Sequence, residues 1–317
     1  MMNKRMLGRT GLEIAPLVFG GNVFGWTVDQ QTSFALLDRF VDAGLNAIDT
    51  ADAYSTWVHG NQGGESETII GNWLKILPAR REKIIIITKV GSRLAEDKQG
   101  LSAKYIMTAV EDSLRRLQTD YIDLYLSHKP DTETPIEETL RAYDKLIQQG
   151  KVKAIGASNY SANQLHEALT VAADQGFARY EVLEPEYNLY DRSGYERELR
   201  DLCIGEGLGV ITYYSLASGF LSGKYRSHDD LGKSVRGQGA SKYLNDRGFR
   251  ILDALDNVAK AHNAAPAEVA LAWLIAREGV TAPIASATNI QQLESLIRAV
   301  DLTLSASDIE LLTAASD

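Results

Sequence analysis

The chain has 317 residues, of which 44% are hydrophobic and 24% charged, with a formal net charge of −9. This composition is typical of a globular protein with ample material for a core, and the negative charge argues against nucleic acid as a partner. The single cysteine, Cys203, excludes an internal disulfide and a cysteine-rich metal site. We therefore expect no metal and a cytoplasmic location. No apolar run is long enough to span a bilayer, and Met1–Met6 does not lead into the apolar segment of a signal peptide.

Short apolar runs alternate with helical patterns from about residue 16 to residue 300. The predicted strands are residues 17–19, 46–49, 84–89, 122–126, 153–157, 181–184, 210–213 and 283–286. The predicted helices are residues 31–43, 65–77, 103–117, 135–149, 162–173, 195–206, 249–262, 267–277, 290–300 and 307–315. The strands are apolar throughout rather than alternating, which indicates parallel strands covered by helices. Ser102 and Ser161 precede two of the helices, and Pro135 is expected at the first position of a third.

The repeat of strand and helix predicts a single domain, residues 1–317, folded as a closed (β/α)₈ TIM barrel. A doubly wound open sheet is the alternative, and it requires a G-x-G-x-x-G turn after the first strand. In this chain that turn contains Gly20, Gly21 and Gly25, which do not have the required spacing. The barrel is therefore favoured.

Two segments lie outside the repeat. Residues 7–14 contain Arg9-Thr10-Gly11, a turn that predicts an N-terminal β-hairpin placed to plug the barrel floor. Residues 217–247 form a long loop after the seventh strand, with six basic and three acidic side chains. Loops of this length are usually functional or disordered. We interpret this one as a clamp for phosphate, with a solvated charged loop as the alternative.

Four polar residues follow three consecutive predicted strands. Asp49 ends the second strand and Tyr54 follows it, Lys89 ends the third, and His128 follows the fourth. Neighbouring parallel strands bring such residues together at the mouth of a barrel. An ammonium beside a tyrosine hydroxyl is expected to lower its pKa from about 10, so that it can protonate a carbonyl oxygen while hydride arrives from elsewhere.

Each residue also has a structural alternative. Asp49 could cap the following turn, Tyr54 could pack in a loop, and His128 could be an ordinary packed or surface histidine. Lys89 is harder to explain in this way, because an inward-facing lysine is costly without a partner. The four residues together favour the catalytic interpretation.

Longer motifs surround these residues and carry a resemblance. They are Asp49-Thr50-Ala51-Asp52-Ala53-Tyr54, Ile87-Thr88-Lys89, Asp123–Asp131, Gly150–Asn159, Glu186–Leu189, Leu216–Tyr225 and Ala285–Thr288. Over nearly its whole length the chain resembles the aldo-keto reductase superfamily. The resemblance implies a catalytic tetrad of Asp49, Tyr54, Lys89 and His128, with Tyr54 as proton donor. It also implies a nicotinamide cofactor that lies across the barrel mouth.

The same resemblance implies a cofactor-binding residue at several positions. Ser158 and Asn159 correspond to the pair that binds the nicotinamide carboxamide, and Tyr213 to the aromatic residue that stacks on its ring. The other positions, at the phosphates and along the strand ends, are Gly21, Asp49, Leu216, Ser218, Gly219, Lys224 and Arg236. Small residues there let backbone N–H groups approach the phosphates, and Lys224 neutralises charge. Arg236 is the weaker candidate, because it could equally be a solvated loop arginine.

Two further positions bear on which cofactor binds. Thr288 and Gln292 correspond to residues that contact the adenosine 2′-phosphate, and they match the hydroxyl and glutamine that potassium-channel beta subunits use for NADPH. NADPH/NADP+ is therefore expected, with NADH less favoured. Most relatives have glutamine where this chain has Glu184. A carboxylate there cannot donate to the carboxamide oxygen unless it is protonated, and burial would raise its pKa.

The sequence says least about which residues contact the substrate. The segment 55–64 is longer than in relatives and follows Tyr54 directly, so Trp57 and Trp26 are candidate substrate contacts beside His128. We expect an NADPH-dependent oxidoreductase that reduces a small aldehyde or ketone, with no membrane partner and an undetermined oligomeric state. The alternative is an NADPH-binding sensor or accessory subunit with little turnover. The histidine at position 128, which the channel subunits lack, favours turnover.

Overall fold

The computed structural model describes residues 3–317. The prediction that Met1–Met6 does not begin a signal peptide therefore lies partly outside the described residues. Eight parallel strands close into a barrel in the order β10-β3-β4-β5-β6-β7-β8-β9. These strands are β3 (Val18–Gly20), β4 (Ala47–Asp49), β5 (Ile85–Val90), β6 (Ile122–Ser127), β7 (Val152–Ser158), β8 (Tyr180–Glu184), β9 (Gly209–Thr212) and β10 (Ala282–Ala285). The predicted TIM barrel is confirmed.

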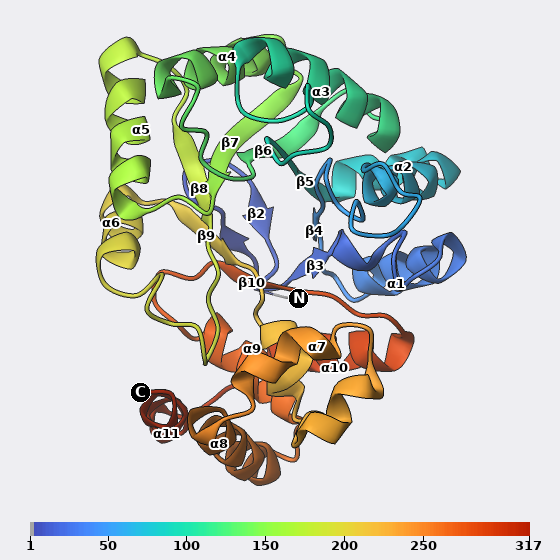
Figure 1. The fold of residues 1–317 in the computed structure, drawn as a ribbon, viewed down its shortest axis with the longest axis vertical. Helices are drawn as coiled ribbons and strands as arrows, with labels where there is room; N and C mark the ends of the chain where they lie inside the picture. Colours follow the sequence, from blue (N-terminus) through green and yellow to red (C-terminus); the bar gives the residue numbers. More distant parts are fainter. Residues whose placement is uncertain (1–2) are drawn as a thin grey trace.

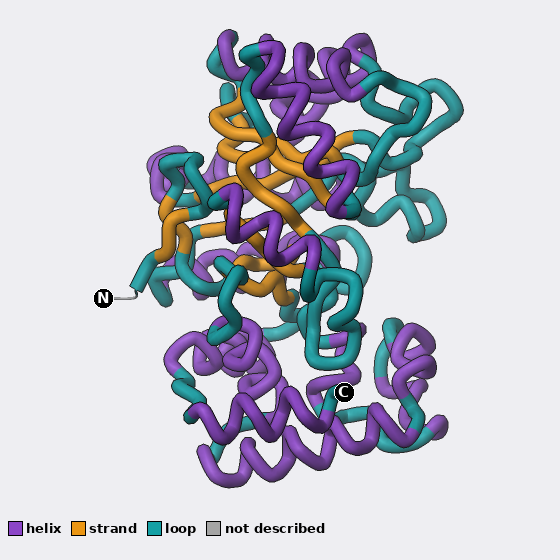
Figure 2. The backbone as a smooth tube through the Cα atoms, turned by 90° about the vertical axis from the view of Figure 1, so that its left-hand side faces the viewer, coloured by secondary structure: helices purple, strands orange, loops and turns teal. Residues whose placement is uncertain are grey.

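Helices connect the strands and cover the outside of the barrel (Figure 1 and Figure 2). They are α1 (Gln30–Asp42), α2 (Glu65–Ile76), α3 (Ala103–Leu117), α4 (Ile136–Gln148), α5 (Ala162–Gln175), α6 (Glu198–Glu206), α7 (Gly237–Ala240), α8 (Asp246–His262), α9 (Pro266–Ile275), α10 (Ile290–Asp301) and α11 (Ala306–Ala315). At the lower end of Figure 1, α11 lies beside α8. Among residues 3–317, no helix is long and apolar enough to cross a bilayer. The cytoplasmic location stays a prediction.

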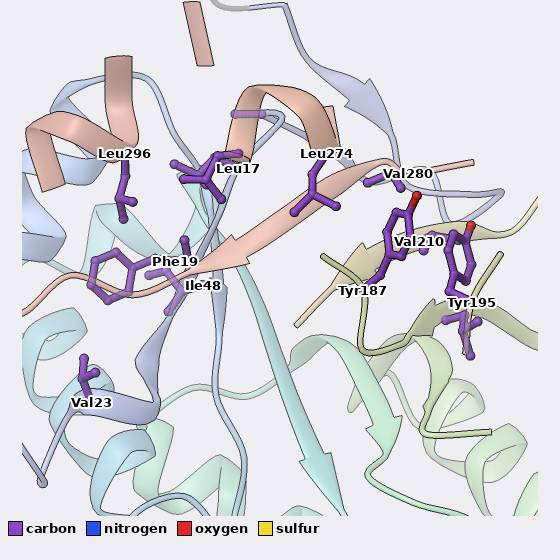
Figure 3. Close-up of a cluster of buried hydrophobic side chains, with 14 of the residues drawn as sticks. Leu17, Phe19, Val23, Ile48, Tyr187, Tyr195, Val210, Leu274, Val280 and Leu296 are labelled. Carbon is purple, nitrogen blue, oxygen red and sulfur yellow. The ribbon is translucent and has the colours of Figure 1, made fainter. Parts of the chain in front are cut away.

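The core has two parts, because each barrel strand is buried on both faces. The outer part lies between the strands and the helices, and Figure 3 shows a section of it with Phe19, Ile48 and Leu296 on one side and Tyr187 and Val210 on the other. Trp73 and Trp273 are fully buried there. The inner part fills the barrel with aliphatic side chains.

The N-terminal hairpin closes the barrel floor, as predicted. Strand β1 (Arg5–Met6) pairs antiparallel with β2 (Glu13–Ile14), and Leu7 and Ile14 belong to the inner core. Gly8 lies against the amino ends of β8 and β9 with a φ of +59°, and a Cβ there would sit 2.4 Å from the carbonyl oxygen of Glu181. Only glycine fits this approach without strain.

Helices α1, α9 and α11 begin one residue earlier than predicted, and three other helix starts also differ. Helix α6 begins at Glu198 rather than at residue 195, because Arg197 has a φ of 75° that a helix cannot contain. Pro135 is the N-cap of α4, with extended backbone, rather than its first helical residue. Helix α8 begins three residues earlier than expected, where the Asn245 side chain accepts a hydrogen bond from the Gly248 N–H.

The long loop after β9 is confirmed in position, but it is not without structure. It contains the 3₁₀ helices η3 (Ala217–Ser222), η4 (His228–Lys233) and η5 (Ser241–Tyr243), together with α7. Two other 3₁₀ helices, η1 (Gly21–Val23) and η2 (Pro78–Lys83), were not predicted either. Each is only one or two turns long, too short to show helical periodicity in the sequence.

Candidate active site

Alternation along the strands places polar residues inside the mouth of the barrel. Successive side chains of a strand point to opposite faces, so residues two positions apart share a face. In five strands an aliphatic residue of the inner core is followed two positions later by a polar one: Ala47 by Asp49, Ile87 by Lys89, Leu126 by His128, Val182 by Glu184 and Ile211 by Tyr213. The polar residues therefore form a layer above the aliphatic filling, at the carboxyl ends of the strands.

Lys89 lies at the centre of this layer and is fully buried. Its ammonium forms an ion pair with Asp49 and donates hydrogen bonds to the Tyr54 hydroxyl, at 2.9 Å, and to the carbonyl oxygen of Thr50, at 3.1 Å. The Tyr54 hydroxyl donates to the second oxygen of Asp49 at 2.8 Å. Asp49, Tyr54 and Lys89 thus form a closed triangle of hydrogen bonds. The sequence carries no signal for the Thr50 contact, because it uses the main chain.

His128 completes the predicted set of four. Its ring lies 6.0 Å from the Tyr54 ring, centre to centre, at an interplanar angle of 75°. Its Nδ1 atom is buried and has no hydrogen-bond partner among the described residues. Burial, followed by the positive charges of Lys89 and Lys129, lowers the pKa of His128 to about 3. The imidazole is therefore neutral at physiological pH.

The prediction that Lys89 lowers the pKa of Tyr54 is wrong in this structure. Burial raises the pKa of Tyr54 well above its ordinary value, and the negative charges of Asp49 and Glu184 raise it further. The ammonium is already paired with Asp49 and lies 3.3 Å from Glu184, so its charge is largely compensated before it acts on the phenol. Tyr54 is consequently protonated at neutral pH.

Glu184 lies closer to the tetrad than the sequence indicated. One carboxyl oxygen is 3.3 Å from the Lys89 ammonium, and the other is buried without a partner among residues 3–317. Burial and the nearby charge of Asp49 raise the pKa of Glu184 to about 8, although Lys89 opposes them. Sequence reasoning assigned Glu184 to the carboxamide and missed its contact with Lys89. The signal that could have found it is the shared inward position of both residues on their strands.

The residues expected at the nicotinamide lie beside the tetrad. Ser158 donates its hydroxyl hydrogen to the Glu184 carbonyl oxygen at 2.9 Å. The Asn159 amide donates to the His128 carbonyl oxygen at 2.9 Å and accepts from the Tyr213 hydroxyl at 2.6 Å. Hydrogen bonds therefore fix Tyr213 and Asn159 on the side of the mouth where β7, β8 and β9 end.

The segment expected to bind the pyrophosphate is a tight backbone turn. Ser218 and Gly219 have φ values of 56° and 89° inside η3, and the Gly219 N–H donates to the Leu216 carbonyl oxygen at 2.8 Å. A Cβ on Gly219 would lie 3.1 Å from the Lys224 ammonium. After β3, a Cβ on Gly21 would lie 2.9 Å from the Asp49 carbonyl oxygen.

Lys224 and Arg236 form no ion pair with a carboxylate within the described part of the chain. Lys224 lies 5.0 Å from the centre of the Tyr225 ring. Burial lowers the pKa of Arg236, and its guanidinium carbon is 5.9 Å from the centre of the Trp26 ring. Positive side chains without a carboxylate partner, next to a tight glycine turn, are suited to bind the phosphates of an anionic dinucleotide.

Thr288 and Gln292 are bonded to each other at the start of α10. The Gln292 carboxamide oxygen accepts from the Thr288 N–H at 2.9 Å and from its hydroxyl at 3.1 Å. The Asn289 side chain caps the same helix by accepting from the Gln292 N–H at 2.9 Å. The pair therefore presents polar groups at a helix N-terminus, a position that favours an anion.

An aromatic wall extends from Tyr54 toward the long loop. Trp57 is 51% exposed, and its ring lies 6.2 Å from Tyr54 and 5.6 Å from Trp26, edge to face. The structure thus places Trp57 beside the predicted acid and Trp26 next to Trp57, and about half of the Trp57 surface is exposed.

Comparisons with known proteins agree with this geometry. The Aldo/keto reductase family pattern matches residues 16–317. The chain belongs to the aldo/keto reductase family. It is 34% identical to the uncharacterized oxidoreductase YrpG of Bacillus subtilis (strain 168) over 98% of this chain and 95% of the relative. It is also 32% identical to a probable aldo-keto reductase 1 of Glycine max, over 96% of this chain and 86% of the relative.

A third relative carries a different name. A probable voltage-gated potassium channel subunit beta of Oryza sativa subsp. japonica is 35% identical, over 95% of this chain and 92% of that protein. Family membership makes this aldo/keto reductase an NAD(P)H-dependent oxidoreductase acting on carbonyl groups and alcohols. The buried unpartnered oxygen of Glu184, the tight glycine turn at Gly219 and the Lys224 ammonium beside it, which has no carboxylate partner among the described residues, fit such a cofactor.

Proposed function

We propose that the protein reduces an aldehyde or ketone to an alcohol with NADPH, and that Tyr54 is the proton donor. The observation that carries the proposal is the position of the Tyr54 hydroxyl at the barrel mouth. It lies 2.9 Å from the Lys89 ammonium and 2.8 Å from Asp49, and the neutral His128 ring faces it.

Each member of the tetrad has a distinct role in this proposal. The reduced nicotinamide supplies the hydride. Tyr54, protonated at neutral pH, gives its phenolic hydrogen to the carbonyl oxygen, and Lys89 stabilises the phenolate that remains. Asp49 keeps Lys89 charged and in place. His128 is neutral, so it orients the carbonyl oxygen by a hydrogen bond without competing as an acid.

The cofactor would lie across the strand ends. Ser158, Asn159 and Glu184 would hold the carboxamide, and Tyr213 would stack on the ring. The backbone at Gly21, Leu216, Ser218 and Gly219 and the charges of Lys224 and Arg236 would hold the pyrophosphate. Thr288 and Gln292 would receive the adenosine 2′-phosphate, which favours NADPH over NADH.

The substrate would enter along the aromatic wall. Trp57 and Trp26 would contact its carbon skeleton, and His128 its oxygen. Aromatic side chains provide a large apolar contact with one polar edge, which suits a small carbonyl compound. We therefore propose a small aldehyde or ketone as substrate.

The test is a comparison of the wild-type protein with Tyr54→Phe. We expect the wild type to consume NADPH with at least one of a panel of aldehydes and ketones. Tyr54→Phe should lose at least ~100-fold in turnover, because it removes the general acid, while NADPH still quenches or shifts the protein fluorescence with similar affinity. Turnover by Tyr54→Phe at the wild-type rate would contradict the assignment of the proton donor.

A second candidate function follows from the similarity to probable potassium channel beta subunits. In that case the protein would bind NADPH and signal its occupancy to a partner, with little chemistry. Tight NADPH binding without turnover of any carbonyl in the panel would favour this candidate.

A further inference from the structure

One buried cation in the active site faces two carboxyl groups. Lys89 forms an ion pair with Asp49 from β4 and a second, at 3.3 Å, with Glu184 from β8. Asp49 is 1% exposed and Glu184 is 2% exposed. Neither carboxyl group can therefore rely on water to balance its charge.

The charges do not balance when both carboxyl groups are ionised. Two negative groups and one ammonium leave an excess negative charge in the barrel, which is costly away from water. One proton held by the carboxyl pair removes that excess. Glu184 is the place for it, because a protonated Glu184 can donate a hydrogen bond to Asp49, an interaction that raises the pKa of Glu184 and lowers the pKa of Asp49.

The titratable groups that act on Glu184 are few. Asp49 on β4 and Lys89 on β5 affect it directly. In turn, the negative charge of ionised Glu184 raises the pKa of Tyr54, which follows β4, and of Tyr213, which follows β9. Lys89 is the one cation in this group, so the charge state of Glu184 decides how much of that cation is available to Tyr54.

We propose that Glu184 is a positioning residue for the proton donor, which acts on Tyr54 through Lys89 by binding or releasing a proton. With Glu184 protonated, Asp49 is the one carboxylate in this group that attracts Lys89, which also donates to the Tyr54 oxygen and the Thr50 carbonyl oxygen. With Glu184 ionised, Lys89 is shared with a second carboxylate, and Tyr54 holds its proton more strongly. This inference rests on the proposed role of Tyr54 in carbonyl reduction.

The pH range of the effect follows from the environment of Glu184. Its pKa is raised to about 8, by burial and then by Asp49. Below that pH the side chain is neutral and resembles glutamine, so wild type and Glu184→Gln should behave alike. Above it the wild type gains a negative charge that the variant lacks, and this charge keeps Tyr54 protonated at higher pH.

The first experiment compares turnover with pH at saturating NADPH for wild type, Glu184→Gln and Glu181→Gln. Saturation is needed because we also expect Glu184→Gln to change cofactor affinity by ~threefold or more. The alkaline limb of kcat should move to lower pH by about one unit or more in Glu184→Gln. Glu181 lies on the same strand and pairs with Arg179, so the matched variant should keep the wild-type limb. Superimposed profiles of wild type and Glu184→Gln would overturn the inference and leave the proposed reduction intact.

The second experiment needs neither turnover nor cofactor. Infrared difference spectra between Glu184→Gln and wild type should show a protonated carboxyl band that belongs to the wild type and disappears as the pH rises through about 8. Absence of such a band at every pH would overturn the inference. If the band is present but no carbonyl is reduced, the proton on Glu184 is supported and the proposed function is the part that fails.

Discussion

At the scale of single residues, burial shifts the pKa values of two neighbours of Lys89 in opposite directions, whereas Lys89 lowers both. Lys89 helps to keep His128 neutral. It opposes the rise in the pKa of Glu184 but does not cancel it. Groups a few ångströms apart thus have pKa values on either side of neutrality, which is how one site can hold an acid and a neutral hydrogen-bond donor together.

The neutral state of His128 gives a pH prediction. Its pKa of about 3 in the folded protein is below the value of about 6.5 in an unfolded chain. The unfolded state therefore binds a proton that the folded state excludes, and this residue should reduce stability as the pH falls from about 6.5 toward 3. We expect the His128 ring signal, assigned by its loss in His128→Gln, to show no titration in NMR spectra between pH 7 and pH 5. A midpoint near 6.5 would contradict the burial and charge argument.

At the scale of elements, close packing of helices explains a residue that local preference disfavours. Gly71 lies inside α2, where alanine would ordinarily be more stable. A Cβ at this position would sit 2.0 Å from the carbonyl oxygen of Arg116 on α3. The two helices therefore approach each other as closely as they do because Gly71 has no side chain. The contact also brings Arg116 near Glu67, to which it is paired at 2.6 Å.

Two glycine-to-alanine substitutions distinguish the effect of helix–helix packing from the effect of helix propensity. Gly71→Ala should lower the free energy of unfolding by roughly 1–3 kcal/mol, because the backbone of α3 must move. Gly205 in α6 has no atom within 4 Å of its Cβ position, so Gly205→Ala should raise the free energy of unfolding by about 0.5–1 kcal/mol. Urea denaturation of both variants measures the difference. Equal effects of the same sign would show that the α2–α3 contact does not depend on Gly71.

At the scale of the whole molecule, the net charge of −9 opposes the approach of an anionic dinucleotide. The loop after β9 counters this locally, with six basic and three acidic side chains in residues 217–247. Most of the basic side chains in the loop are occupied by protein partners, such as Lys233 with Asp230 at 2.7 Å. Lys224 has no such carboxylate partner in the described structure, so its charge is available to a ligand.

This arrangement predicts a specific loss on removal of one charge. Lys224→Met should weaken NADPH binding about tenfold, or ~1.4 kcal/mol, and should make binding less sensitive to added salt, because a screened attraction has been removed. Lys75→Met removes an equal charge from the exposed end of α2 and serves as the control. Fluorescence titrations at low and high salt would measure both variants. Equal affinities of Lys75→Met and Lys224→Met would mean that only net charge matters.

Local patterns in the sequence determined that the chain folds as a barrel and which polar side chains lie in the layer at its mouth. Apolar runs with a strict strand and helix alternation admit few other folds, and the side-chain period of two assigns Asp49, Lys89 and Glu184 to the interior once the strands are known. The hairpin was predicted from the local preferences of its turn residues, although its first strand, Arg5–Met6, precedes the predicted segment 7–14. Short 3₁₀ helices and the start of α6 were not readable, since they depend on single dihedral angles such as that of Arg197.

Closure of the barrel decided what the sequence could not. The contact of Glu184 with Lys89 joins strands that lie on different sides of the mouth, and its length depends on how far the strands tilt and shift as the barrel closes. The high pKa of Tyr54 arises in the same way, because burial, followed by the negative charges of Asp49 and Glu184, raises it only once the barrel has closed. Sequence spacing sets the face on which a side chain lies, whereas distances between faces, and therefore charges and pKa values, exist only in the folded molecule.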